Sequence, residues 1–100
     1  MTWIDWTAYY ETMPANKIDL AIKLEADRMA NSLYEKEDVE SERTVIISER
    51  QGSENQPIFL LSEETQAAAF RVHPYHHEVI GDKIDIESMN RSLVVENSTS

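Results

Sequence analysis

Apolar residues recur along most of the chain at helical spacing. Between residues 15 and 32 they fall every three or four positions, with Ile18, Ile22 and Met29 on one face. This periodicity predicts an amphipathic helix over "ANKIDLAIKLEADRMANS". Asn16 is suited to cap its start, because an asparagine side chain can accept a hydrogen bond from a free backbone N–H.

A second helical pattern begins near Lys36. Val39, Glu42, Ile46 and Glu49 are separated by three and four residues, which predicts that they share one stripe of a long helix. The acidic residues of its first turn suit the positive end of the helix dipole. The sequence therefore predicts a long helix that carries two carboxylates on the same stripe as apolar residues.

Glycine and proline divide the rest of the chain. Gly52 and Pro57 predict a break after the long helix, and Pro57 is a favourable first residue for the next helix, "PIFLLSEETQAAAF". The segment "RVHPYHHEVIG" is expected to be a loop, because Pro74 disfavours helix at the residue before it and Gly81 closes the segment. One short helix is expected over "DIESMNRSLVVE".

The N-terminal stretch "TWIDWTAYYETMP" is rich in aromatic residues and threonine, which favour strands. It predicts a strand from Trp6 to Met13, ended by Pro14. One strand cannot form a sheet, so its partners should lie outside this chain or in a second copy of it. We therefore expect an α+β fold that is predominantly helical with one N-terminal strand, and a homo-oligomer could form through that strand.

Composition narrows the function classes. The 100 residues suit one small domain, and 19 acidic against 9 basic residues give a net charge of −10. Nucleic acids and anionic membrane surfaces are disfavoured as partners, since both attract basic clusters. The chain has no cysteine, which excludes disulfides and thiolate zinc sites. No apolar run approaches the roughly 20 residues of a membrane span.

Glu42 and Glu49 are the candidate site residues. Seven residues are nearly two helical turns, so their side chains should leave one side of the helix about 10 Å apart along its axis. They cannot both bind one small metal ion from a straight helix. Spacing alone favours an ordinary structural role, in which Glu42 pairs with a nearby Arg or Lys and Glu49 faces water.

Three short motifs change that weighting: "LEADRM", the pattern E-R-x-V-I-x-x-E inside "SERTVIISER", and "HPY" followed by "VIG". In this order and spacing, from Asp5 to Arg91, the chain resembles the pitrilysin/insulinase family of zinc metallopeptidases, the inverzincins. The resemblance implies helices packed on a sheet. Residues 5–91 are then expected to form a partial peptidase-like domain, and residues 92–100 the end of a short helix and a disordered polar tail.

The resemblance also implies roles for the two glutamates. Glu49 corresponds to the family's distal zinc ligand, Glu42 to an acidic residue that supports the site, and the reaction is hydrolysis of peptide bonds by zinc-activated water. The family's His-x-x-Glu-His motif is absent, since His73, His76 and His77 have the wrong spacing and follow Glu49. One ligand cannot hold zinc, so we expect no zinc at the family site of this chain and no peptidase activity from it alone.

Three alternatives stay open. The chain could belong to a non-catalytic structural subunit or domain of the same family. It could instead be an unrelated acidic helical interaction module. The adjacent His76 and His77 could bind a metal, but neighbouring side chains in a loop usually point apart, which favours ordinary loop histidines with adventitious nickel or zinc affinity.

Overall fold

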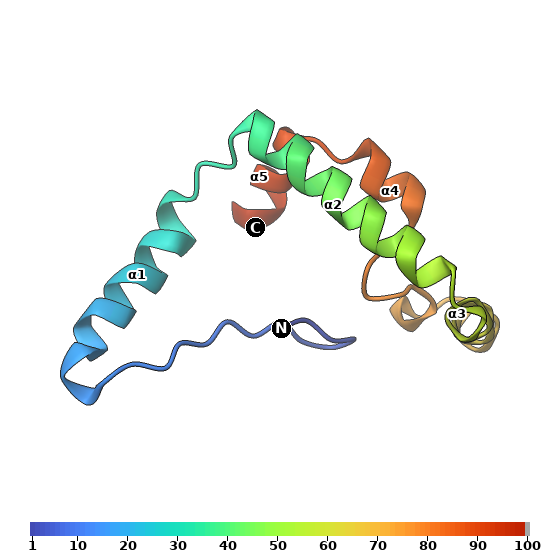
Figure 1. The fold of residues 1–100 in the computed structure, drawn as a ribbon, viewed down its shortest axis with the longest axis horizontal. Coiled ribbons are helices and arrows are strands. Elements are labelled where there is room, and N and C mark those ends of the chain that lie inside the picture. Colours follow the sequence, from blue (N-terminus) through green and yellow to red (C-terminus); the bar gives the residue numbers. More distant parts are fainter. Residues whose placement is uncertain (100) are drawn as a thin grey trace. The chain divides into compact units, whose positions relative to one another are not determined.

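The computed structural model describes the backbone of residues 1–99 and the side chains of residues 1–98. The chain is predominantly helical (Figure 1). Its elements, in chain order, are the 3-10 turn η1 (Ala15–Lys17), α1 (Ile18–Asn31), α2 (Lys36–Glu54), α3 (Pro57–Ala69), the 3-10 turn η2 (Pro74–His76), α4 (Lys83–Ser88) and α5 (Arg91–Thr99).

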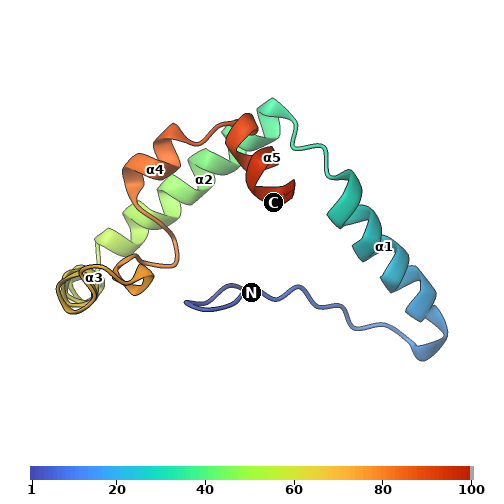
Figure 2. The ribbon, with the colours of Figure 1, turned by 180° about the vertical axis from the view of Figure 1, so that it is seen from behind.

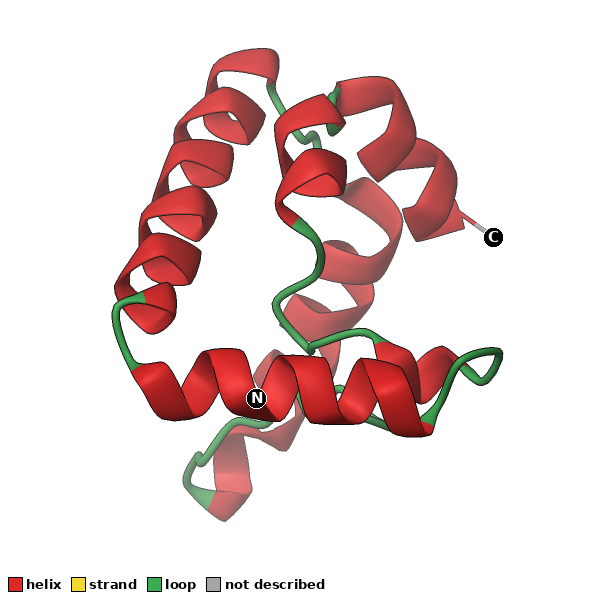
Figure 3. Ribbon diagram, turned by 90° about the vertical axis from the view of Figure 1, so that its right-hand side faces the viewer, coloured by secondary structure: helices red, strands yellow, loops and turns green. Residues whose placement is uncertain are grey.

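The predicted N-terminal strand is absent. Residues 1–99 contain no strand (Figure 3), and the N-terminal segment holds only an isolated antiparallel bridge between Thr2 and Thr7. The main-chain N–H of Ala8 donates to the carbonyl of Met1 at 2.9 Å, which closes a short loop. A strand needs a neighbour to satisfy its backbone groups, and the segment from Tyr9 to Met13 has none here. Aromatic composition alone therefore overpredicted a strand.

The chain divides into two compact units, Met1–Leu33 and Tyr34–Ser100. In the N-terminal unit, α1 begins where expected but without a side-chain cap, since Asn16 lies inside η1. Arg28 of α1 places its guanidinium 3.9 Å from the ring centroid of Tyr9 and bonds Glu25 at 2.7 Å. The contact with Tyr9 joins the helix to the extended segment before it, whereas the bond to Glu25 lies within α1.

The C-terminal unit contains α2 to α5 and holds the two buried residues, Arg50 and Ile86, among the side chains described. Helix α4 lies along α2, an arrangement visible from both sides (Figures 1 and 2). Helix α3 contacts the turn η2 and also contacts α2. The predicted start of α2 near Lys36 and the start of α3 at Pro57 are confirmed, but Gly52, which was expected to mark a break, lies inside the last turn of α2.

The last predicted helix is instead two helices. Helix α4 ends at Ser88, and Met89 adopts an extended backbone before α5 starts at Arg91. The Asn90 side chain accepts a hydrogen bond from the backbone N–H of Leu93 at 3.2 Å, which caps α5. Helix α5 continues into the expected polar tail as far as Thr99, and Ser100 lies outside the described residues.

The inward stripe of α2 differs from the predicted one. Val39 and Ile46 are partly buried as expected, but Arg43 is also partly buried and Arg50 is buried, whereas the two glutamates of the predicted stripe are exposed. Residues 39, 43, 46 and 50 keep the four-three-four spacing of one helical face. Arginine can occupy such a face because its methylene stem packs while its guanidinium reaches polar partners.

None of the helices described over residues 1–99 has the length and apolar character needed to cross a membrane.

Candidate functional site

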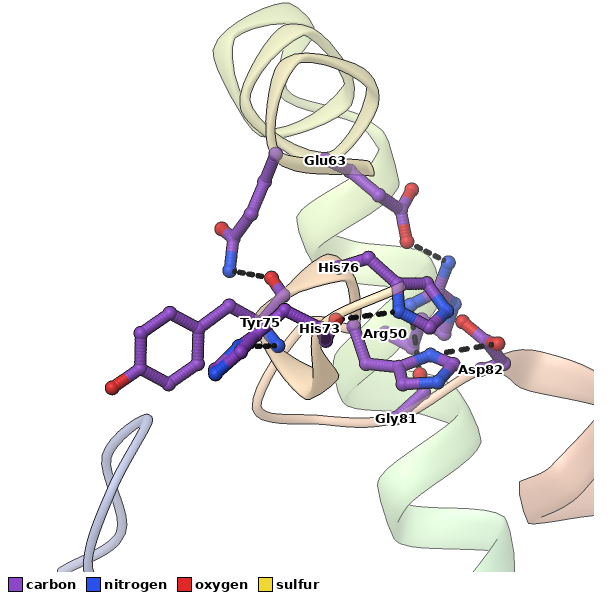
Figure 4. A network of polar contacts seen from close by, with 9 residues as sticks. Arg50, Glu63, His73, Tyr75, His76, Gly81 and Asp82 are labelled. Carbon is purple, nitrogen blue, oxygen red and sulfur yellow. Dashed lines mark hydrogen bonds and ion pairs between the residues drawn. The ribbon is translucent and has the colours of Figure 1, made fainter. Parts of the chain in front are cut away.

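Arg50 is the centre of the main polar network of the C-terminal unit. Its Nη1 donates to the carbonyl of Gly81 at 2.9 Å and its Nη2 donates to Glu63 Oε1 at 2.6 Å (Figure 4). Glu54 Oε1 lies 3.1 Å from Nε as an ion pair, one turn further along α2. One guanidinium therefore connects α2, α3 and the loop before α4.

The charge of Arg50 is strongly favoured by its surroundings. The hydrogen bond to Glu63 raises the pKa of the guanidinium above its ordinary value, and the charges of Glu63, Glu54 and Asp82 act in the same direction. Burial of the side chain opposes this shift but is the smaller effect. Arg50 is a permanently charged anchor whose buried charge is compensated by a carboxylate and a carbonyl.

Glu42 and Glu49 lie on the exposed side of α2 next to this anchor. Both residues are exposed, and neither side chain makes a hydrogen bond or ion pair with the residues that the structure describes. Other acidic residues nearby are paired: Glu40 with Lys36 at 3.9 Å, and Glu63 with Arg50. The ion pair that spacing alone favoured for Glu42 is therefore not formed.

A cleft of about 400 Å³ lies between α2, α4 and α5, and Glu42 is on its wall. Most of the lining is apolar, and the partly buried Arg43 stands next to Glu42 with a buried Nε that has no hydrogen-bond partner among the described residues. Glu49 does not line this cleft. The structure therefore places the two glutamates along one helix but brings only Glu42 into the cleft.

The described part of the chain holds no group of three or more His, Asp or Glu side chains arranged to bind a metal ion. Zinc in a catalytic site needs about three protein ligands. Glu49 has no histidine neighbour that could complete such a set, because the histidines all lie in the loop around η2. Neither Glu42 nor Glu49 belongs to a ready-made set of ligands among the described residues.

The comparisons with known proteins identify the class and the family. The model of the insulinase family, peptidase family M16, matches residues 1–83, so the chain belongs to that family of metallopeptidases. This confirms the resemblance inferred from the short motifs.

The relatives carry related names. The chain is 33% identical over 86 residues to an uncharacterized zinc protease of Mycobacterium leprae, which covers 86% of this chain and 19% of that protein. It is 31% identical over 85 residues to a probable mitochondrial-processing peptidase subunit beta of Schizosaccharomyces pombe, covering 85% of this chain and 19% of that protein. The chain thus spans about a fifth of the length of these relatives. No solved structure gives a significant match.

Sequence reasoning missed Arg50 as an organising residue. The signal was present in the spacing, since Arg43 and Arg50 stand seven residues apart and interleave with Val39 and Ile46. A charged residue at such a position is normally assigned to the solvent face, so the pattern drew attention to the glutamates instead. Its partner Glu63 and the Gly81 carbonyl come from distant segments that periodicity cannot pair.

Proposed function

We propose that this chain is a segment of a zinc metallopeptidase and contributes one carboxylate, that of Glu49, to the zinc site of the complete protein. Glu42, two turns earlier on α2, supports the site. The observation that carries the proposal is the E-R-x-V-I-x-x-E pattern on one helix of an insulinase-family chain. Both carboxylates are exposed and unpaired within the described chain, so they are free to meet groups from elsewhere.

In the complete protein zinc would supply an activated water for hydrolysis of peptide bonds. The part played by this chain is positional. Helix α2 presents Glu49, while Arg50, the next residue, fixes the rotation of the helix through its bonds to Glu63 and the Gly81 carbonyl. The ligands that this chain lacks, two histidines, and the general-base glutamate would come from a His-x-x-Glu-His segment outside it.

The substrate class that follows is a peptide or protein. The names of the relatives, zinc protease and mitochondrial-processing peptidase subunit beta, belong to those proteins. These names support peptide hydrolysis as the reaction of the complete protein, but they do not indicate which peptide sequence it cleaves. The chain alone supplies too few ligands, so we propose that it is inactive by itself.

The second candidate is a non-catalytic subunit or domain of the same family. Such a subunit would have every family feature that this chain has. It would differ from a catalytic protein only by lacking the zinc ligands that lie outside this chain. An acidic helical interaction module is a third candidate, and the family match over residues 1–83 argues against it.

The test uses the complete reading frame that contains this chain, expressed as protein and assayed for bound zinc by mass spectrometry of metals. Glu49→Gln should remove most of the zinc, because an amide is a weak ligand in place of a carboxylate. Glu42→Gln should keep the zinc and lower peptide cleavage. Glu40→Gln is the matched control, since Glu40 lies on the same helix and pairs with Lys36.

Full zinc occupancy in the Glu49→Gln protein would contradict the assignment of the ligand. A complete protein that holds no zinc and cleaves no peptide, with all variants equal, would favour the non-catalytic subunit.

A further inference from the structure

The loop around η2 contains two histidine rings in contact. The ring centroids of His76 and His77 are 3.7 Å apart at an interplanar angle of 41°. Neighbouring side chains in a loop were expected to point apart, and these do not. The 3-10 turn explains the difference: the N–H of His76 donates to the carbonyl of His73 at 3.1 Å, and the N–H of His77 donates to that of Pro74 at 3.3 Å.

The contacts of the three histidines assign their neutral tautomers. His76 Nδ1 lies 3.0 Å from the carbonyl oxygen of His73 (Figure 4). His77 Nδ1 lies 3.3 Å from Asp82 Oδ2. A carbonyl and a carboxylate only accept hydrogen bonds, so both Nδ1 atoms carry the proton. Nε2 of both rings then presents a lone pair, which is the form that binds metals.

His73 has the opposite arrangement. Its Nδ1 accepts a hydrogen bond from the backbone N–H of Tyr75 at 3.2 Å. The proton of the neutral ring must therefore sit on Nε2, where it blocks metal binding. His76 and His77 are thus in the tautomer whose Nε2 can bind a metal, and His73 is not.

We propose that His76 and His77 bind one divalent transition-metal ion through their two Nε2 atoms. A metal-binding histidine commonly donates its other ring N–H to a carboxylate or a backbone carbonyl, and these two rings already do so, to Asp82 and to the His73 carbonyl. Two imidazoles bound side by side on one ion place their centroids about 4.5 Å apart at nitrogen–metal distances near 2.0–2.1 Å. The observed centroids are 3.7 Å apart at an interplanar angle of 41°, so binding requires the two rings to open and to turn their Nε2 atoms toward one ion.

The site is a weak, open one. Among the described residues no third His, Asp or Glu completes a ligand set, so water fills the remaining positions. Nickel and copper bind imidazole nitrogen more tightly than the lighter divalent metals do, so they are the suitable probes. The net charge of −10 and the adjacent Glu78 favour the approach of a cation. This site is separate from the family zinc site, since it uses neither Glu42 nor Glu49.

The test is calorimetric titration of the full 100-residue chain with Ni²⁺. The expected result is one saturable site that is lost in His76→Gln and in His77→Gln. Asp82→Ala should weaken binding by about 10-fold, because it removes the acceptor that orients His77. His73→Gln is the matched control and should bind as the parent chain does. Circular dichroism checks that each variant keeps its helices.

The proposal is overturned if the parent chain shows no saturable binding. It is also overturned if either single His76 or His77 variant binds like the parent, or if His73→Gln loses binding to the same degree. The last outcome would mean that the loop histidines act independently as adventitious ligands.

Discussion

Arg50 shows how one residue can hold a thinly packed unit together. Its guanidinium bonds the Gly81 carbonyl and Glu63, and its side chain is only 9% exposed. Ile86 is the other buried residue among those described. Removing either partner of a buried charged pair leaves the charge of the other partner uncompensated. The loss of stability on removing one partner is therefore larger than the net stabilisation that the pair provides.

The substitution Arg50→Met should lower the free energy of unfolding of the C-terminal unit by about 2 kcal/mol, because Glu63 and the Gly81 carbonyl lose their donor. Urea denaturation followed by circular dichroism measures the change. Lys36→Met is the matched control: the Lys36 side chain is 79% exposed and its ammonium lies 3.9 Å from Glu40, so its removal should have little effect. Equal stability of the two variants would show that the Arg50 network adds nothing.

Glu25 gives a pH-dependent prediction at the same scale. The hydrogen bond from Arg28 lowers the pKa of the Glu25 carboxyl, with the Arg28 charge helping and desolvation opposing. Because this pKa is lowered in the folded chain, the stabilisation is present above the ordinary glutamate pKa and is lost as pH falls through the lowered value. NMR titration of the carboxyl should show the low pKa, and Arg28→Gln should return it toward normal. An unchanged titration in that variant would exclude the Arg28 bond as the cause.

Residue spacing was enough to predict helix α2 but not to choose which of its faces points inward. Three- and four-residue spacing fits Val39, Glu42, Ile46 and Glu49 as well as it fits the arginine-containing stripe. The choice depends on partners such as Glu63, which lie in distant segments. The roles of Glu49 as a zinc ligand and of Glu42 as a residue that supports the site came from family motifs and stay predictions.

At the scale of elements, the helices were predictable and the strand was not. Helix α2 and α3 follow from local periodicity and from proline at a helix start. The segment from Trp6 to Met13 has strand-like composition, but a strand depends on a neighbour that this chain does not supply. The split between α4 and α5 was missed because Met89 and Asn90 carry no glycine or proline signal.

The two glycines give a matched prediction on the elements that contain them. Gly81 has a φ of +85°, and a Cβ there would meet only Ile86 Cγ1 at 4.0 Å. The cost of Gly81→Ala is therefore backbone strain, about 1 kcal/mol of unfolding free energy. Gly52 lies inside α2 with nothing within 4 Å of an added Cβ.

The opposite sign is expected for Gly52→Ala, which should stabilise the unit by about 0.5 kcal/mol, since alanine loses less backbone entropy in a helix. Thermal unfolding of both variants gives the comparison. The account of these two sites fails if Gly81→Ala is the more stable protein.

At the scale of the whole molecule, the N-terminal unit contains no buried residue, whereas the C-terminal unit contains Arg50 and Ile86. Much apolar surface of α1 is exposed, including Ile18 at 61%, Ile22 at 62% and Met29 at 76%. Exposed apolar surface of this extent marks a face that normally packs against something else. The chain spans about a fifth of its relatives' length, so the rest of a longer protein or a second copy could cover it.

Amide hydrogen exchange should therefore be faster in α1 than in α2, because the hydrogen bonds of an uncovered helix open locally at little cost. The measurement is exchange of the 100-residue chain at low concentration followed by mass spectrometry of peptides. Protection of α1 equal to that of α2 would mean that its face is covered. Sedimentation at rising concentration would then test the expected homo-oligomer.

The measurement that tests the central claim most directly is to read the coding DNA upstream of the Met1 codon in the source material. The account predicts an in-frame His-x-x-Glu-His some tens of residues before Met1, which would provide the two histidines and the general base that Glu49 requires. An in-frame sequence without that motif, or a stop codon directly before Met1, would contradict the claim that this chain completes a catalytic zinc site.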